Sequence, residues 1–225
     1  MSDMRFIANA TTLPGVPNGA YIGARSTRDG SLFVEDWKQS MILAGYAFHF
    51  DHGTLTTPIV GGGNGTILDI DEPEGFIAVP TGMSIIPLRL SIQCELVSPA
   101  DHEIQEILVY ADKGVEAVTG AVYTAKVPYN MRLTSARAAS CVCGGGVTTA
   151  FTAAPVADIQ LARKQVVDDF TTSGHVSEIF ELLYEPLHPP ILDGPCILCW
   201  SWGGTQAMSG FFQMDFIERV TSELI

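Results

Sequence analysis

Apolar and polar side chains alternate along much of this chain, and this period of two restricts the fold more than any other feature. In residues 88–96 the apolar side chains occupy the even positions and the polar ones the odd positions. Residues 211–217 repeat the pattern, with Phe212, Met214 and Phe216 on one face. Successive side chains of a β-strand point to opposite sides of its sheet. Both segments are therefore predicted to be long strands with one buried face.

Shorter segments rich in β-branched and aromatic residues, bounded by Gly and Pro, predict further strands. They cover residues 43–50, 66–70, 76–79, 103–110, 120–127, 141–152, 175–184 and 196–202. The charge content of 103–110 also permits a helix, but its β-branched and aromatic residues favour a strand. The last two strands of the chain, 196–202 and 211–220, are expected to pair antiparallel around a long loop. Pro87 predicts a bulge or an edge position where the strand at 88–96 begins.

Residues 158–169 are the best candidate for a helix. Asp158 can cap the first turn, and Ile159, Ala162 and Val166 share one face at helical spacing. A strand remains the alternative for this segment.

Eight or nine strands separated by turns, without alternating helices, predict an all-β fold. We expect an antiparallel jelly-roll-like β-sandwich over residues 36–225, with at most one short helix. A sandwich of another topology is the alternative, and the Cys, Trp, Cys spacing of immunoglobulin domains is absent. Residues 1–35 carry turn residues without periodicity, which predicts an irregular N-terminal arm able to dock on a neighbouring subunit.

The composition argues for protein partners and against nucleic acid or membrane. Charged residues make up 16% of the chain and hydrophobic ones 47%. Ordinary domains carry roughly 25% charged residues, so we expect apolar surface that is covered in a homo-oligomer. The formal charge of −13 opposes binding to a phosphate backbone. No apolar run approaches the length of a membrane span, and the first residues do not resemble a signal peptide.

The five cysteines could in principle supply a zinc site, because Cys141 and Cys143 form one close pair and Cys196 and Cys199 another. In a strand, however, residues three apart point to opposite faces, so Cys196 and Cys199 cannot both bind one ion without a knuckle turn, and no glycine follows them to form one. We expect buried, reduced thiols made in a cytoplasm, and no metal.

No other residues form a pattern that predicts catalysis or a cofactor. His49 and His52 lie close to Asp51 in the sequence. Two other residues separate these histidines, whereas a single residue separates the two histidines that bind metal in cupins. The glycine run at 61–65 lacks the Lys-Ser/Thr ending of a phosphate-binding loop. We therefore predict a protein that is not an enzyme and has no cofactor.

The large aromatic residues are the candidates for a binding surface. Trp200 and Trp202 share one face of their predicted strand, which suits a sugar platform, a subunit interface or the core. We assign Trp37, Trp200, Trp202 and Phe211 to an interface with other subunits.

Residues 194–205, followed by 211–218, resemble the closing strands of jelly-roll structural proteins of tailed-phage and related virions. Residues 80–90, in which Pro-Thr-Gly opens a strand, are similar to segments of the same proteins. The resemblance implies a capsid-associated β-sandwich, commonly a homotrimer, that serves as a decoration or cement protein or as a coat subunit. It carries over no catalytic residue.

Charge helps to choose between these roles. Coat proteins that package nucleic acid tend to have a basic arm, whereas this arm holds only Arg5, Arg25 and Arg28 before Lys38. We therefore expect a decoration or cement protein on the outer surface of a virion, made in the host cytoplasm, that binds capsid protein and itself. The alternatives are a carbohydrate-binding or receptor-binding module and a major or minor coat subunit.

Overall fold

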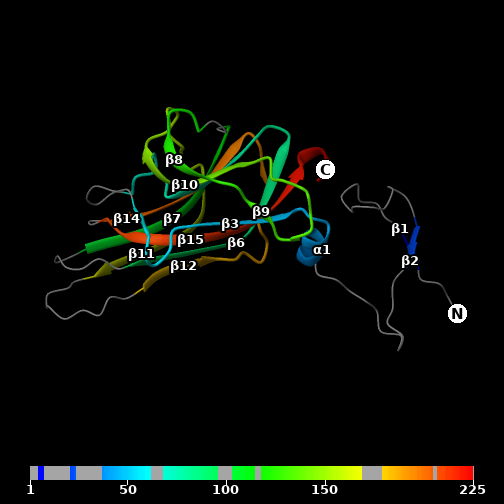
Figure 1. Cartoon of the computed structure of the whole chain (residues 1–225), viewed down its shortest axis with the longest axis horizontal. Helices are drawn as coiled ribbons and strands as arrows, with labels where there is room; N and C mark the ends of the chain where they lie inside the picture. Colours follow the sequence, from blue (N-terminus) through cyan, green and yellow to red (C-terminus); the bar gives the residue numbers. More distant parts are fainter. Residues whose placement is uncertain are drawn as a thin grey trace.

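The chain folds into two large antiparallel sheets that pack face to face (Figure 1). The computed structural model describes residues 5–7, 21–23, 37–61, 68–95, 103–114, 118–168, 179–204 and 207–224. The predicted all-β antiparallel sandwich is confirmed. Of the predicted arm, only β1 (Arg5–Ile7) and β2 (Tyr21–Gly23) are described, and these two strands pair with each other.

The first large sheet has six strands. Their order across the sheet is β11 (Ile159–Asp168), β7 (Glu103–Lys113), β14 (Cys196–Gly204), β5 (Gly75–Val79), β10 (Val142–Thr149) and β8 (Val122–Lys126). The strands predicted at 103–110, 120–127 and 76–79 are therefore confirmed.

The second large sheet has seven strands. Their order is β12 (Ile179–Tyr184), β6 (Met83–Glu95), β15 (Ser209–Val220), β3 (Ala47–His52) and β9 (Tyr129–Asn130), while β13 (Leu192–Asp193) pairs with β6 and β4 (Ile59–Val60) with β15. A short 3₁₀ helix, η1 (Thr221–Glu223), follows β15.

The core lies between the two sheets, and the predicted alternation places side chains in it. Phe212, Met214 and Phe216 of β15 are buried in the main cluster. Their neighbours Gln213 and Asp215 face outward, where Gln213 is exposed and Asp215 half-buried. The period of two therefore identified the inner face of β15.

The bulge predicted at Pro87 is confirmed. The register of β6 against β15 shifts there, because Asp215 pairs with Arg89 while Phe216 pairs with Pro87. The extra residue, Leu88, packs in a small outer cluster rather than the main core. A one-residue insertion moves every later side chain of the strand to the opposite face. In β6 the odd-numbered Ile85 therefore faces the core before the bulge, and the even-numbered Leu90 and Ile92 face it after the bulge.

The predicted helix at 158–169 is wrong, and the strand alternative holds. This segment is β11, which lies at the edge of its sheet and pairs along its length with β7. Its register shifts between Gln160 and Ala162, so Leu161, Ala162 and Val166 all pack against the main core. A bulged strand can thus imitate helical spacing, and the ladder with β7 overrides the local propensity.

The α-helix of the described residues lies elsewhere. Helix α1 (Trp37–Leu43) precedes β3 and covers the outer face of the seven-stranded sheet at the end where β15 finishes (Figure 1). Its side chains Met41 and Ile42 pack on Ala47, Leu88 and Ile217. The strand expected from residue 43 therefore begins only at Ala47.

The last two strands do not pair with each other, contrary to the prediction. β14 lies between β7 and β5 in one sheet, and β15 lies between β6 and β3 in the other. The chain therefore changes sheet between the end of β14 at Gly204 and the start of β15 at Ser209, so the two strands are not a hairpin.

Smaller differences concern short segments. Residues 68–70 are irregular, so the strand expected at 66–70 is wrong in its described part. Residues 66–67, 96 and 175–178, and most of the glycine run at 61–65, lie outside the described residues.

Candidate functional site

Trp200 and Trp202 lie in the core, so their assignment to an interface is wrong. They share one face of β14, as predicted, and both are fully buried. Trp200 packs edge-on against Phe212, with ring centroids 4.8 Å apart, and tilts against Phe50 at 6.0 Å. Neither a sugar nor a partner subunit can reach these indoles from the surface.

Trp37 and Phe211, the other two predicted interface residues, keep access to the surface. Trp37 on α1 is 43% exposed. Phe211 is half-buried on the outer face of the seven-stranded sheet.

All five cysteines are buried and free, as predicted. Cys196 packs in the main core and Cys199 in the cluster on the opposite face of their sheet. Burial raises the pKa of every thiol, that of Cys196 to about 11. Over the described ranges, no group of three metal-binding side chains comes together.

The outer face of the seven-stranded sheet carries a line of polar residues, which we call the polar row. Strand register places Tyr129, His49, Asp215 and Arg89 side by side across β9, β3, β15 and β6. His49 Nδ1 donates a hydrogen bond to Asp215 Oδ1 at 2.5 Å. Its ring also lies 5.3 Å from the ring of Tyr129.

Asp51 extends the polar row by one residue pair along β3. Tyr129 Oη donates to Asp51 Oδ1 at 2.6 Å, and His49 Nε2 lies 3.9 Å from the same oxygen. The hydrogen bond to this carboxylate, with some burial, raises the pKa of Tyr129. The network fixes β9 against β3 and holds the imidazole between two acids.

His52 belongs to the other side of β3. Its ring stands edge-on to Phe212 at 6.3 Å, on the core side, whereas His49 faces outward. The two imidazoles therefore lie on opposite faces of the sheet.

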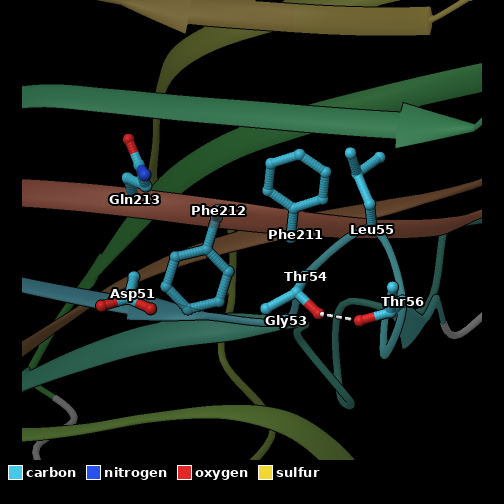
Figure 2. Close-up of a pocket in the computed structure, with 8 residues that line it drawn as sticks. All are labelled: Asp51, Gly53, Thr54, Leu55, Thr56, Phe211, Phe212 and Gln213. Atoms are coloured by element: carbon cyan, nitrogen blue, oxygen red, sulfur yellow. Dashed lines mark hydrogen bonds between the residues drawn. The ribbon is translucent and has the colours of Figure 1, made fainter.

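A shallow hollow of about 390 Å³ adjoins Asp51 (Figure 2). Leu55 and Phe211 stand beside each other along it, and Asp51 and Gln213 lie at the opposite end (Figure 2). Leu55 is 82% exposed at the tip of the turn after β3. The lining is mainly apolar, with Asp51 and Gln213 as its polar end.

The turn that carries Leu55 is held in shape by threonines. Thr54 Oγ1 lies 2.8 Å from Thr57 Oγ1 and 3.1 Å from Thr56 Oγ1, and the backbones of Thr54 and Thr57 exchange two hydrogen bonds. Gly53 precedes the turn at a positive φ of 79°, where a Cβ would also meet Gly210 O at 2.9 Å. The exposed leucine is thus presented by an ordered turn.

Sequence reasoning missed the polar row because its contacts are distant in the chain. His49 and Asp215 are 166 residues apart. The outward parity of Asp215 at 211–217 and the closeness of His49 to Asp51 in the chain were signals, but neither of them predicts the contact of His49 with Asp215.

Comparison with protein-family models, curated proteins and solved structures finds no match to this chain. Across the described residues, no helix has the length and hydropathy needed to cross a membrane.

Proposed function

We propose that the sandwich is a jelly roll. Without the short strands and the β8 and β10 insertion, eight main strands remain: β3, β5, β6, β7, β11, β12, β14 and β15. Numbered one to eight, they lie in the order 6-3-8-1 in one sheet and 5-4-7-2 in the other. This interleaving of two four-stranded sheets is the connectivity of two Greek keys folded together, and it carries the proposal.

We infer further that the protein is a structural component on the outside of a virion. Jelly rolls recur in capsid proteins, and this chain resembles virion proteins in its closing strands. Its formal charge of −13 suits an outer position better than contact with packaged nucleic acid. A decoration or cement role follows, in which the protein associates with itself and clamps neighbouring shell subunits.

The hollow beside Asp51 supports this role. Leu55 and Phe211 offer apolar contact on a face with polar surroundings, the composition typical of subunit interfaces. The glycan-binding alternative loses its main support, because Trp200 and Trp202 are buried.

The proposal can be tested on virus particles purified from the source that encodes this chain. They are banded in a density gradient, and the chain is quantified by mass spectrometry before and after mild denaturant. A decoration protein should band with the shell at a fixed ratio and dissociate while the shell stays intact. Loss of the shell together with the chain would identify a coat subunit instead, and a chain that stays at the top of the gradient would overturn the virion assignment.

Native mass spectrometry tests the oligomer. We expect a homotrimer at micromolar concentration. A monomer throughout the accessible range would contradict self-association.

A further inference from the structure

Arg137, which follows β9, has a guanidinium without an acidic partner among the described residues. Its Cζ lies 4.2 Å from the centroid of the Tyr46 ring, and its Nε is buried without a hydrogen bond. Two other arginines of the described residues do have such partners, since Arg163 pairs with Glu106 and Arg219 with Glu223. A guanidinium stays charged in proteins, so Arg137 keeps the capacity to bind an anion.

Asn130 and Tyr46 hold this part of the surface in place. Asn130 Nδ2 donates to Gly45 O at 2.8 Å and to Arg137 O at 3.4 Å, while its Oδ1 accepts from Arg132 N at 3.0 Å. The segment that carries both arginines is thereby attached to the chain just after α1. Little conformational entropy remains to be lost when a partner binds.

Arg132 adds a second cation on the same segment, and its backbone N–H donates to the same Asn130 side chain that donates to Arg137 O. Its Nη1 donates to Leu43 O at 2.5 Å, at the end of α1. This contact fixes an otherwise exposed side chain and leaves its other donors available. Leu133, the next residue along the chain, is 91% exposed, and Leu43, whose carbonyl Arg132 binds, is 50% exposed. We call Leu43, Arg132, Leu133 and Arg137 the arginine patch.

The charge of the chain indicates what the arginine patch binds. The sequence has 12 Lys and Arg against 25 Asp and Glu, so most of a second copy's charged surface is acidic. An arginine fork beside apolar side chains complements a carboxylate on such a surface, and arginine is enriched at interfaces. A basic region on an acidic chain also steers copies toward each other.

We propose that the arginine patch binds a carboxylate side chain of a second copy of this chain, with Arg137 as the main donor. The inference rests on the self-association in the proposed function and names the surface that produces it.

Sedimentation velocity of the full chain tests the proposal. Arg137→Gln removes the charge and keeps much of the stem, and Arg163→Gln, at the far edge of the six-stranded sheet, removes one charge as the matched control. We expect Arg137→Gln to raise the dissociation constant of self-association about tenfold or more, and Arg163→Gln to change it less than about threefold. Added salt should weaken the wild-type association more than that of Arg137→Gln.

The outcomes separate the two proposals. Equal effects of the two variants on a wild-type oligomer would overturn the arginine patch and leave the proposed function standing. A wild-type chain that stays monomeric would overturn the arginine patch and the predicted self-association together. If Arg137→Gln self-associates normally but no longer bands with the shell, the partner is capsid protein rather than a second copy. Circular dichroism and an Arg137→Lys variant, which should associate more tightly than Arg137→Gln, exclude loss of the fold as the cause.

Discussion

At the scale of single residues, polar side chains near the core are fitted closely into their surroundings. His52 lies between Phe212 and the glycines of β10, where a Cβ on Gly145 would come within 2.9 Å of the imidazole Cδ2. Burial lowers the pKa of His52, and the charge of Lys126 lowers it further, while Asp51 opposes both. The folded chain therefore favours the neutral ring.

This shift predicts a pH dependence of stability. The unfolded chain takes up the proton near pH 6.5 and the folded chain only below it, so the stabilisation by neutral His52 is present above pH 6.5 and lost as the pH falls through the folded pKa. Urea unfolding at pH 7.5 and 5.5 should show a smaller loss of unfolding free energy for His52→Gln than for wild type. His188→Gln, at an exposed position, is the control and should behave as wild type. Identical losses in all three proteins would contradict the prediction.

The buried thiols make a second prediction at this scale. Burial raises the pKa of all five, to about 11 for Cys196, so almost no thiolate is present at pH 8. Ellman's reagent should react slowly with the native chain and rapidly with five thiols after unfolding. Rapid labelling of two or more cysteines in the native chain would be incompatible with this core.

At the scale of elements, close packing of strands depends on small residues at particular positions. Gly75 of β5 pairs with Trp200 of β14, and a Cβ on Gly75 would come within 2.2 Å of the indole. The glycine lets the large ring lie over the neighbouring strand. A core packed at this density cannot accept another methyl group without movement.

Gly75→Ala should therefore destabilise the chain by about 1–3 kcal/mol, because the indole or the strand must shift. The cost should be smaller in a Trp200→Leu background, where the indole is gone. Denaturant unfolding of the two single variants and the double variant measures this coupling. Additive effects would show that the indole is not the cause.

At the scale of the whole molecule, buried polar contacts connect one sheet to the other. Glu218 of β15 is fully buried, and its carboxylate accepts hydrogen bonds from the backbone N–H groups of Ser140 and Cys141, each at 2.9 Å. That segment leads into β10, which belongs to the six-stranded sheet. The carboxylate thus joins the two layers at the end of the sandwich.

Glu218→Ala should lower the free energy of unfolding by about 1–3 kcal/mol, because buried N–H groups lose their acceptor. Glu218→Gln retains an acceptor oxygen and should lose less. Glu181→Ala, at an exposed position of β12, serves as the control and should stay within about 0.5 kcal/mol of wild type. An equal loss for the Ala and Gln variants would point to the charge rather than the hydrogen bonds.

The sequence by itself determined the strands that expose one face and bury the other. Phe212, Met214 and Phe216 were correctly predicted to share one buried face, because alternation of apolar and polar residues depends only on which face of the strand is exposed to solvent. The bulge at Pro87 and the burial of the cysteines followed from equally local properties, namely the missing N–H of proline and the apolar character of a protonated thiol. The sequence also determined the formal net charge of −13, which does not depend on the fold.

Only the tertiary structure decided which strands are neighbours and which surfaces remain open. Every residue of β14 is buried, so its sequence could not show that Trp200 and Trp202 point into the core. Residues 159–168 form a strand because they pair with β7. The hydrogen bond of His49 to Asp215 likewise depends on two segments that are far apart in the chain. The physical reason is that periodicity shows which face of a single strand is buried. Which strands pair, and which side chains meet in a site, depends on contact energies between segments that are distant in the sequence.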